Sequence, residues 1–154
     1  MDATRQETSV DVAGTPEQVW DALTNPEMTR RYYYGTDILS DWKPGSRWTS
    51  ESDGELYLDG ELLEVDAPNR IVQTFHIASE EPAASEAPSK VTWQLTSLGG
   101  GETRVQMIHE DMGPATRNYV EGGWEHILAG LKSVVESTDE LDQSMDAKVP
   151  VESA

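Results

Sequence analysis

Residues Asp59–Phe75 read DGELLEVDAPNRIVQTF, and this stretch decides the fold. An extended run of residues leads to the turn residues Ala67–Asn69, and a second extended run begins at Arg70. An Ala-Pro-Asn sequence between two extended runs is typical of a turn that joins neighbouring strands. The stretch therefore predicts a strand-turn-strand unit of an antiparallel sheet.

Further extended segments lie on both sides of this unit and are separated by turn residues at Lys43–Gly45, Ser52–Gly54 and Gly99–Gly101. A first strand is expected around Val10–Val12, where apolar and polar residues alternate. The chain thus predicts six to seven antiparallel strands, and those of the meander are Thr36–Leu39, Arg47–Glu51, Glu55–Val65, Arg70–Ala78, Lys90–Leu98 and Glu102–His109.

The alternation of side chains indicates which face of the sheet is buried. Apolar residues and one histidine share one phase, whereas polar residues occupy the other phase. The inward set is Val91, Trp93, Leu95, Val105, Met107 and His109, with Ile71, Gln73, Phe75 and Ile77 on the preceding strand. The outward set is Thr92, Gln94, Thr96, Arg104 and Gln106, with Val72, Thr74 and His76. One face is therefore expected to cover a core.

Helix signals flank the strands. Thr15 with Pro16 and Gln18 is typical of a capped helix start, and Asn25-Pro26 repeats that signal for a second short helix. After Pro114 the period becomes helical, and one long helix is expected with Trp124, Leu128, Leu131 and Val135 on its buried stripe. Gly122 and Gly123 fall inside that helix, and Gly123 is expected to mark its closest approach to the sheet.

The 154 residues suffice for one domain, which we place at residues 1–136. Residues 137–154 are polar, acidic and aperiodic, and are expected to form a disordered tail. The loop Ser79–Ser89 is rich in Pro, Ala, Ser and Glu, and is expected to be mobile. Strands packed with helices in this order indicate an α+β fold.

The composition limits the classes of partner. The net charge is −18, with 29 acidic against 11 basic residues, so the protein should repel nucleic acid. No apolar run approaches the ~20 residues of a membrane-spanning helix, and the first residues do not resemble a secretory signal. The sequence has no cysteine, which excludes disulfides and thiolate metal sites. We expect a cytoplasmic protein that does not insert into membranes.

The sequence contains no motif typical of catalysis. It has no GxSxG elbow, no cysteine nucleophile and no Gly-rich loop between a strand and a helix. The three histidines, His76, His109 and His126, do not have the spacing of a metal site. We therefore predict no catalytic residue, no metal site and no cofactor.

Several segments together resemble a known family. They are YYYG at 32–35, DWKPGS at 41–46, the stretch 59–75, VTWQL at 91–95 and GGWEHILAGL at 122–131. Over residues 10–136 the chain resembles the activator of heat-shock-protein-ninety ATPase homologue family, within the START-like helix-grip superfamily. The resemblance implies a sheet that grips a long C-terminal helix, with an apolar cavity between them, and implies no shared reaction.

Aromatic and inward-facing residues are the candidates for lining such a cavity, although a closed core is an equally sound interpretation for Trp48, Phe75, Trp93 and Trp124. At least one residue of Tyr32–Tyr34 should lie at the cavity mouth. The candidate cavity residues are Tyr32, Tyr33, Trp48, Gln73, Phe75, Trp93, Met107, His109, Trp124 and Leu128. The predicted function is non-catalytic binding of a small apolar or aromatic, lipid-like ligand.

Two alternatives remain open at the level of sequence. One is a co-chaperone-like protein-interaction module with a chaperone as partner, which would require an exposed apolar patch on the outer face of the sheet. The other is a cyclase or hydro-lyase that uses His109 with a cavity carboxylate as general acid and base.

Overall fold

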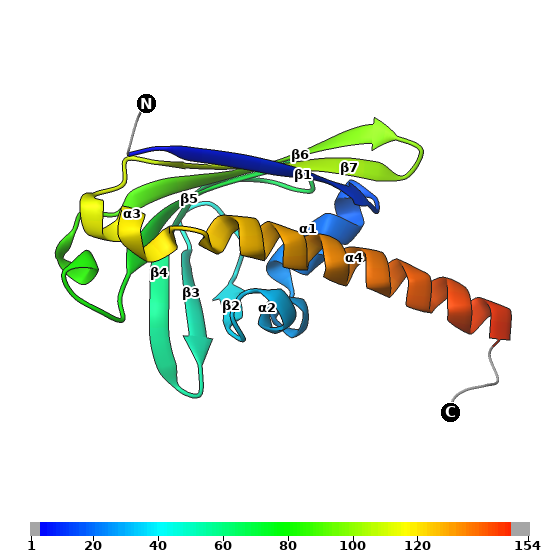
Figure 1. Ribbon diagram of the computed structural model, residues 1–154, viewed down its shortest axis with the longest axis horizontal. Helices are drawn as coiled ribbons and strands as arrows, with labels where there is room; N and C mark the ends of the chain where they lie inside the picture. The colour runs from blue at the N-terminus through cyan, green and yellow to red at the C-terminus, as the bar shows by residue number, and fades with distance from the viewer. Residues whose placement is uncertain (1–3, 149–154) are drawn as a thin grey trace.

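Seven antiparallel strands form one curved sheet, and a long C-terminal helix lies across its concave face (Figure 1). The computed structural model describes the backbone of residues 4–148 and the side chains of residues 4–137. The elements are β1 (Gln6–Ala13), α1 (Pro16–Thr24), α2 (Pro26–Tyr32), β2 (Asp37–Ser40), β3 (Arg47–Ser52), β4 (Glu55–Asp66), β5 (Arg70–Ile77), η1 (Ala83–Ser85), β6 (Ser89–Gly99), β7 (Glu102–Glu110), α3 (Pro114–Val120) and α4 (Gly123–Lys148).

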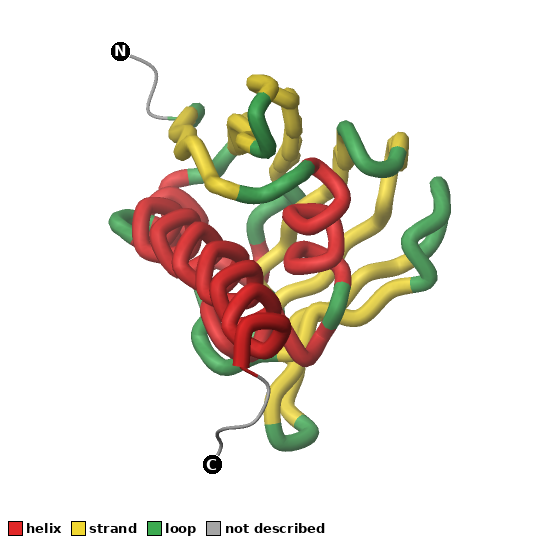
Figure 2. The backbone as a smooth tube through the Cα atoms, turned by 90° about the vertical axis from the view of Figure 1, so that its right-hand side faces the viewer, coloured by secondary structure: helices red, strands yellow, loops and turns green. Residues whose placement is uncertain are grey.

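The order of strands in the sheet is β1-β7-β6-β5-β4-β3-β2. The strands β2 to β7 follow one another as a meander, which confirms the predicted strand-turn-strand pattern. The first strand pairs with the last, because β1 runs antiparallel to β7 with Val10 opposite Val105. Figure 2 shows the helices gathered on one side of the molecule and the strands curving around them. This is the predicted α+β helix-grip architecture.

Local sequence explains the two short helices. The Thr15 side chain accepts a hydrogen bond from the Gln18 backbone N–H, and the Gln18 side chain accepts one from the Thr15 backbone N–H. This reciprocal capping box starts α1. Asn25 caps α2, whose first residue is Pro26. Both predicted helix starts are thus confirmed.

The C-terminal helical region differs from the prediction of one continuous helix. It consists of α3 and α4, and Gly122 lies between them with a φ of +75°. That left-handed conformation ends one helix and allows the next to begin in a new direction, which a residue with a side chain would resist. Gly123 is the first residue of α4 and not an interior position.

We had expected Gly123 to mark the closest approach of α4, but of the two glycines Gly130 makes the tighter contact. A Cβ atom built on Gly130 would lie 2.7 Å from Cβ of Tyr32, whereas one on Gly123 would lie 3.4 Å from the Tyr34 hydroxyl. The tight contact is with the end of α2, so the helix is constrained by the short helices as well as by the sheet.

The predicted tail overlaps with α4. This helix extends to Lys148 and so includes most of the segment 137–154, for which disorder was predicted. Residues 149–154 lie outside the described residues. None of the helices within residues 4–148 has the length and apolar character that crossing a membrane requires.

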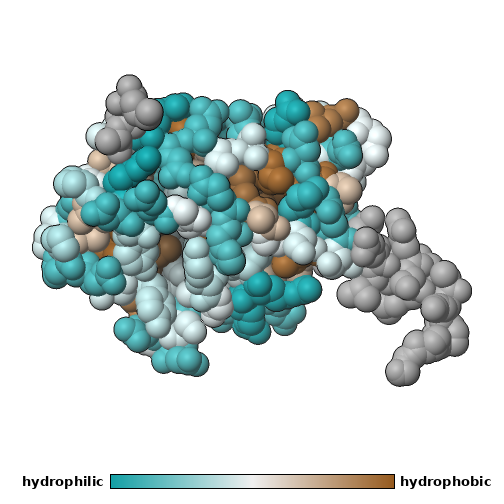
Figure 3. Space-filling model, viewed as in Figure 1, coloured by the Kyte–Doolittle hydropathy of each residue, from teal (hydrophilic) through white to brown (hydrophobic). Residues whose placement is uncertain are grey.

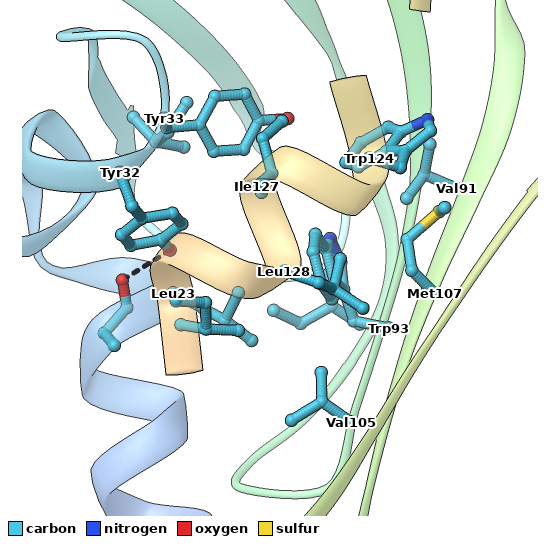
Figure 4. Close-up of a cluster of buried hydrophobic side chains, with 14 of the residues drawn as sticks. Leu23, Tyr32, Tyr33, Val91, Trp93, Val105, Met107, Trp124, Ile127 and Leu128 are labelled. Atoms are coloured by element: carbon cyan, nitrogen blue, oxygen red, sulfur yellow. Dashed lines mark hydrogen bonds between the residues drawn. The ribbon is translucent and has the colours of Figure 1, made fainter. Parts of the chain in front are cut away.

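The predicted inward phase is confirmed. Val91, Trp93 and Leu95 on β6 and Val105 and Met107 on β7 are buried beneath α4. The outward residues Val72 and Thr92 are also buried, because they lie side by side on the central strands of the sheet. Figure 4 shows the core between sheet and helix, where Trp124, Ile127 and Leu128 of α4 project toward Trp93, Met107 and the tyrosines after α2.

The segment Ser79–Ser89, predicted to be a mobile loop, is attached to the domain by specific contacts. Ala83 of η1 is buried, and the carbonyl oxygen of Ala84 lies 2.9 Å from Nε2 of His76. The Glu86 carboxylate accepts hydrogen bonds from the backbone N–H groups of Ala115 and Thr116 at 2.8 Å. The sequence pattern misses these contacts because they join residues far apart in the chain. They fix the position of α3.

Candidate ligand-binding cavity

A cavity of about 510 Å³ lies beside the first turn of α4. Its walls come from β3 and β4, from the segment after α2, and from α3 with the start of α4. The lining residues are Tyr33, Tyr34, Thr36, Ser50, Ser52, Tyr57, Leu58, Phe75, Tyr119, Val120, Glu121, Gly123, Trp124 and Ile127. The volume falls within the range of roughly 300–1,000 Å³ that is usual for small-molecule sites.

A β-bulge shapes the wall formed by β3 and β4. Ser50 pairs with Leu58 and Glu51 pairs with Leu56, so Tyr57 is an extra residue on β4. In a regular strand, Tyr57 and Leu58 would point to opposite faces of the sheet. A bulge changes the direction of one side chain, and here both residues line the cavity. The bulge thus adds an aromatic ring to the wall.

The tyrosines after α2 form the opposite wall. The Tyr33 ring meets the Trp124 ring edge-on, with 6.3 Å between centroids. Tyr34 has a φ of 54° and is 60% exposed, and it stacks on His126 of α4 at 4.9 Å. Tyr34 therefore lies at the mouth, as we predicted for one residue of this run. Tyr32 turns away, and its hydroxyl donates to the carbonyl oxygen of Ala22.

The cavity carries little positive charge. Glu121 is the charged residue among its lining residues, and no lysine, arginine or histidine lines it. Burial raises the pKa of the Tyr33 hydroxyl well above its ordinary value, so this group stays neutral at physiological pH. The lining is therefore aromatic and hydroxyl-bearing, with an acidic group at one edge.

The hydroxyl of Ser50 is buried without a hydrogen-bond partner. Its side chain is 1% exposed, and its Oγ atom has no hydrogen-bond partner. Among the side chains of residues 4–137 it is the one buried polar atom in this condition. An unsatisfied buried hydroxyl is unfavourable for folding by roughly 1–3 kcal/mol. Its place on the cavity wall thus suggests a role other than stabilising the fold.

His109 belongs to the closed core and not to the rim of the cavity. The Trp124 indole N–H donates to Nδ1 at 3.0 Å, so the proton of the neutral ring is on Nε2, which lies 2.7 Å from Ser89 Oγ. The Ser89 hydroxyl in turn donates to the carbonyl oxygen of Phe75. Burial lowers the pKa of His109 to about 3. With both nitrogens bonded and no carboxylate in contact, His109 is not placed for acid–base chemistry on a cavity ligand.

The structure separates the predicted cavity residues into two groups. Tyr33, Phe75 and Trp124 line the cavity. The remainder pack in the core or in another groove, and they are Tyr32, Trp48, Gln73, Trp93, Met107, His109 and Leu128. Trp48, Gln73, Trp93, Met107 and His109 share the inward phase of the sheet and are buried in the closed core, whereas Tyr32 belongs to α2 and Leu128 to α4. The open volume lies beside the start of α4, where Gly123, Trp124 and Ile127 line it.

Sequence reasoning missed most of the polar and mouth residues. Ser50, Ser52 and Tyr57 lie on β3 and β4, near the β2 edge of the sheet. Tyr119 lies in the last turn of α3, and Glu121 lies in the unpredicted break between α3 and α4. The one available signal was the Tyr32–Tyr34 run, of which Tyr33 and the exposed Tyr34 line the cavity. No group of three metal-ligating side chains occurs within the part of the chain whose side chains are described.

A curved antiparallel sheet that grips a C-terminal helix and leaves a cavity beside it defines the helix-grip, START-like class of proteins. Residues 13–136 match the family described as activator of Hsp90 ATPase homolog 1-like protein. The chain belongs to this family, in agreement with the resemblance found in its sequence. No curated protein shows significant sequence similarity to the chain.

Solved structures share this fold. An Hsp90 activator from Plasmodium falciparum, PFC0360w, is 18% identical with a TM-score of 0.72, over 86% of this chain and 96% of that one. MLL2253 from Mesorhizobium loti is 26% identical with a TM-score of 0.69, over 86% and 98% of the two chains. CalU16 from Micromonospora echinospora is 18% identical with a TM-score of 0.68, over 91% and 82%.

Proposed function

We propose that the protein binds a small apolar or aromatic molecule in the cavity between β3, β4 and the start of α4, without catalysing a reaction. The observation that supports this most directly is the cavity itself, of about 510 Å³, with aromatic residues on each wall. Small-molecule sites are mostly apolar and concave, with a few polar groups that orient the ligand. Serine and tyrosine hydroxyls would supply those groups. A cytoplasmic location is part of the same proposal.

The cyclase or hydro-lyase alternative receives less support from the geometry. It assigned acid–base chemistry to His109, whose ring nitrogens are both bonded within the core. The neutral form of His109 is strongly favoured, since burial lowers its pKa to about 3. An enzyme of this kind would need a different proton donor near the cavity.

The co-chaperone alternative rests on the Plasmodium relative, which is described as an Hsp90 activator. We expected that function to require an apolar patch on the outer sheet face. Among the side chains of residues 4–137, the exposed leucines are Leu39 on β2, Leu63 on β4 and Leu98 on β6, and thus lie on different strands. Figure 3 shows hydrophobic surface instead between β1 and α4, in a groove that Val10, Leu128 and Ala129 line. Lys132 lines the same groove and donates a hydrogen bond to the carbonyl oxygen of Asp11 on β1.

Ligand binding is tested by titrating the ¹⁵N-labelled protein with a panel of apolar and aromatic molecules and following amide NMR signals. We expect signals of Tyr33, Ser50 and Trp124 to shift for at least one class of compound. Ser52→Phe should fill the cavity and abolish those shifts, whereas the matched variant Ser97→Phe, on the exposed part of β6, should preserve them. A panel that leaves these signals unmoved, or equal binding by Ser52→Phe, would contradict the proposal.

A further inference from the structure

We infer that the ligand of this cavity is a neutral aromatic molecule with a hydroxyl or carbonyl group, and that this group forms a hydrogen bond with Ser50. This inference rests on the proposed binding function and narrows the class of ligand. It is carried by three features of the cavity: an unpaired hydroxyl, the absence of cationic side chains among the lining residues, and the distribution of rings.

The unpaired hydroxyl is the main observation. Ser50 lies in β3 between Ile38 of β2 and Leu58 of β4, and both of these neighbours are buried and apolar. Ser89 is buried to a similar extent, yet its hydroxyl donates to Phe75 and contacts His109. The hydroxyl of this buried structural serine is therefore fully hydrogen-bonded within the protein. Among the buried serines of residues 4–137, Ser50 is the one that lacks such a partner, and it lines the cavity.

A serine hydroxyl both donates and accepts hydrogen bonds and reorients by rotation about a single torsion angle. It can therefore pair with the hydroxyl of a phenol or with a carbonyl oxygen of a molecule that fills the cavity. A purely apolar ligand would leave Ser50 unsatisfied in the complex as well. Binding of a ligand with a matching polar group removes that penalty, which makes the group favourable for affinity.

Charge indicates that the ligand is neutral. A carboxylate or phosphate placed here would find no lysine or arginine among the lining residues, and it would lie near Glu121 in a protein of net charge −18. An anion that loses its hydration without a cationic partner is strongly disfavoured. Fatty acids and other anionic amphiphiles therefore fit this lining poorly.

The rings indicate an aromatic ligand. Tyr33, Phe75 and Trp124 surround the inner part of the cavity, and Tyr57 and Tyr119 stand on two further walls. Phe75 and Trp124 already pack against one another at 5.8 Å, which leaves edges and faces directed at the open volume. Aromatic rings prefer offset or edge-to-face contacts with other rings. A flat aromatic ligand can form such contacts with several walls at once.

The test compares the probes 2-naphthol, naphthalene and 2-naphthoate on the full chain, by calorimetry with NMR to locate the site. We expect 2-naphthol to bind roughly three- to tenfold more tightly than naphthalene, and 2-naphthoate more weakly than either. In Ser50→Ala the advantage of 2-naphthol over naphthalene should disappear, while naphthalene binds as before. Ser52→Ala, which alters another serine of the wall, should retain that advantage.

The outcomes separate this inference from the binding function. If naphthalene and 2-naphthol bind in the cavity with equal affinity, or if the difference persists in Ser50→Ala, the role of Ser50 is wrong although the protein binds ligands. Tighter binding of 2-naphthoate than of 2-naphthol would contradict the inference that the ligand is neutral. If none of the probes binds although members of the panel do, this inference fails and the binding function stands; if the panel also fails to bind, both fail. The melting temperature of ligand-free Ser50→Ala should equal or exceed that of the original protein, so that lost affinity does not reflect misfolding.

Discussion

At the scale of single residues, Gly130 sets how closely α4 can pack against the end of α2. A Cβ atom at this position would lie 2.7 Å from Cβ of Tyr32. Tyr32 cannot move away easily, because it is buried and its hydroxyl bonds to the carbonyl oxygen of Ala22 at 2.8 Å. A side chain at position 130 therefore forces the helices apart.

We predict that Gly130→Ala destabilises the protein. The steric cost is of the order of 1–3 kcal/mol, against roughly 1 kcal/mol gained in helix propensity. Gly123→Ala is the matched control, since its nearest contact is the Tyr34 hydroxyl at 3.4 Å, and it should change stability by less than about 0.5 kcal/mol. Urea denaturation measures both. A stabilising Gly130→Ala would show that the contact with Tyr32 relaxes freely.

His109 should make stability depend on pH. Its pKa is about 3 in the folded protein and near 6.5 when exposed, so the unfolded chain binds a proton that the folded one excludes. The full contribution is present above pH 6.5 and is lost as the pH falls through the interval down to 3. Between about pH 7 and pH 5 this amounts to about 2 kcal/mol of unfolding free energy.

The measurement is urea denaturation of the original protein and of His109→Gln at several pH values in that interval. Glutamine retains one acceptor and one donor for Trp124 and Ser89 but does not titrate. The original protein should lose stability more steeply than the variant as the pH falls. Any contribution of His76, whose pKa is raised chiefly by its hydrogen bond to the Ala84 backbone, is common to both proteins and cancels. Parallel curves would refute the prediction.

At the scale of elements, Trp124 packs the first turn of α4 against the sheet. Its ring contacts Trp93 at 5.8 Å and Phe75 at 5.8 Å, and its indole N–H bonds to His109. The same ring forms one wall of the cavity. The Trp124 side chain is therefore part of both the closed core and the cavity wall.

We predict that Trp124→Ala lowers the unfolding free energy by about 3–5 kcal/mol, because it removes a large buried ring. Trp124→Phe keeps much of the ring but removes the N–H group, which leaves Nδ1 of His109 unpaired at a cost of about 1–3 kcal/mol. Thermal and urea denaturation of both variants measure the two contributions. Equal stability of Trp124→Phe and the original protein would mean that the hydrogen bond to His109 adds nothing.

At the scale of the whole molecule, negative charge is distributed over a surface with few cations. Arg104 pairs with Asp11 and Arg30 pairs with Asp37, but ion pairs engage only a minority of the carboxylates within residues 4–137. The unpaired carboxylates repel one another, and this repulsion opposes the compact state. Salt should weaken that effect.

We predict that the melting temperature rises as salt increases from ~10 mM to ~1 M, while the Debye length falls from ~30 to ~3 Å. Sodium chloride is the appropriate salt, and a neutral osmolyte at matched osmolality is the control for general exclusion effects. The few surface ion pairs would lose strength under the same conditions, but each contributes only about 0–1 kcal/mol. A melting temperature that stays constant or falls would mean that local pairs outweigh the repulsion.

The sequence by itself determined the strands, the two short helices and their order, but not the division of the C-terminal helical region into α3 and α4. Alternation of residues defined the strands, Thr15 and Asn25 defined the starts of the short helices, and the stripe containing Trp124 and Leu128 defined the face of α4 that is buried. These signals are local, because period and capping depend on residues only a few positions apart. Together with the family resemblance they also indicated a cavity between sheet and helix, with a tyrosine at its mouth.

Only the tertiary structure decided where that cavity lies and which side chains reach it. The inward phase is the same for Trp93 under α4 and for Phe75 at the cavity, so alternation cannot tell a core residue from a lining residue. The difference depends on the turn at Gly122, which sets where α4 begins, and on the bulge at Tyr57. The unpaired state of Ser50 and the bonded state of His109 likewise depend on contacts between distant segments, which no short-range pattern encodes.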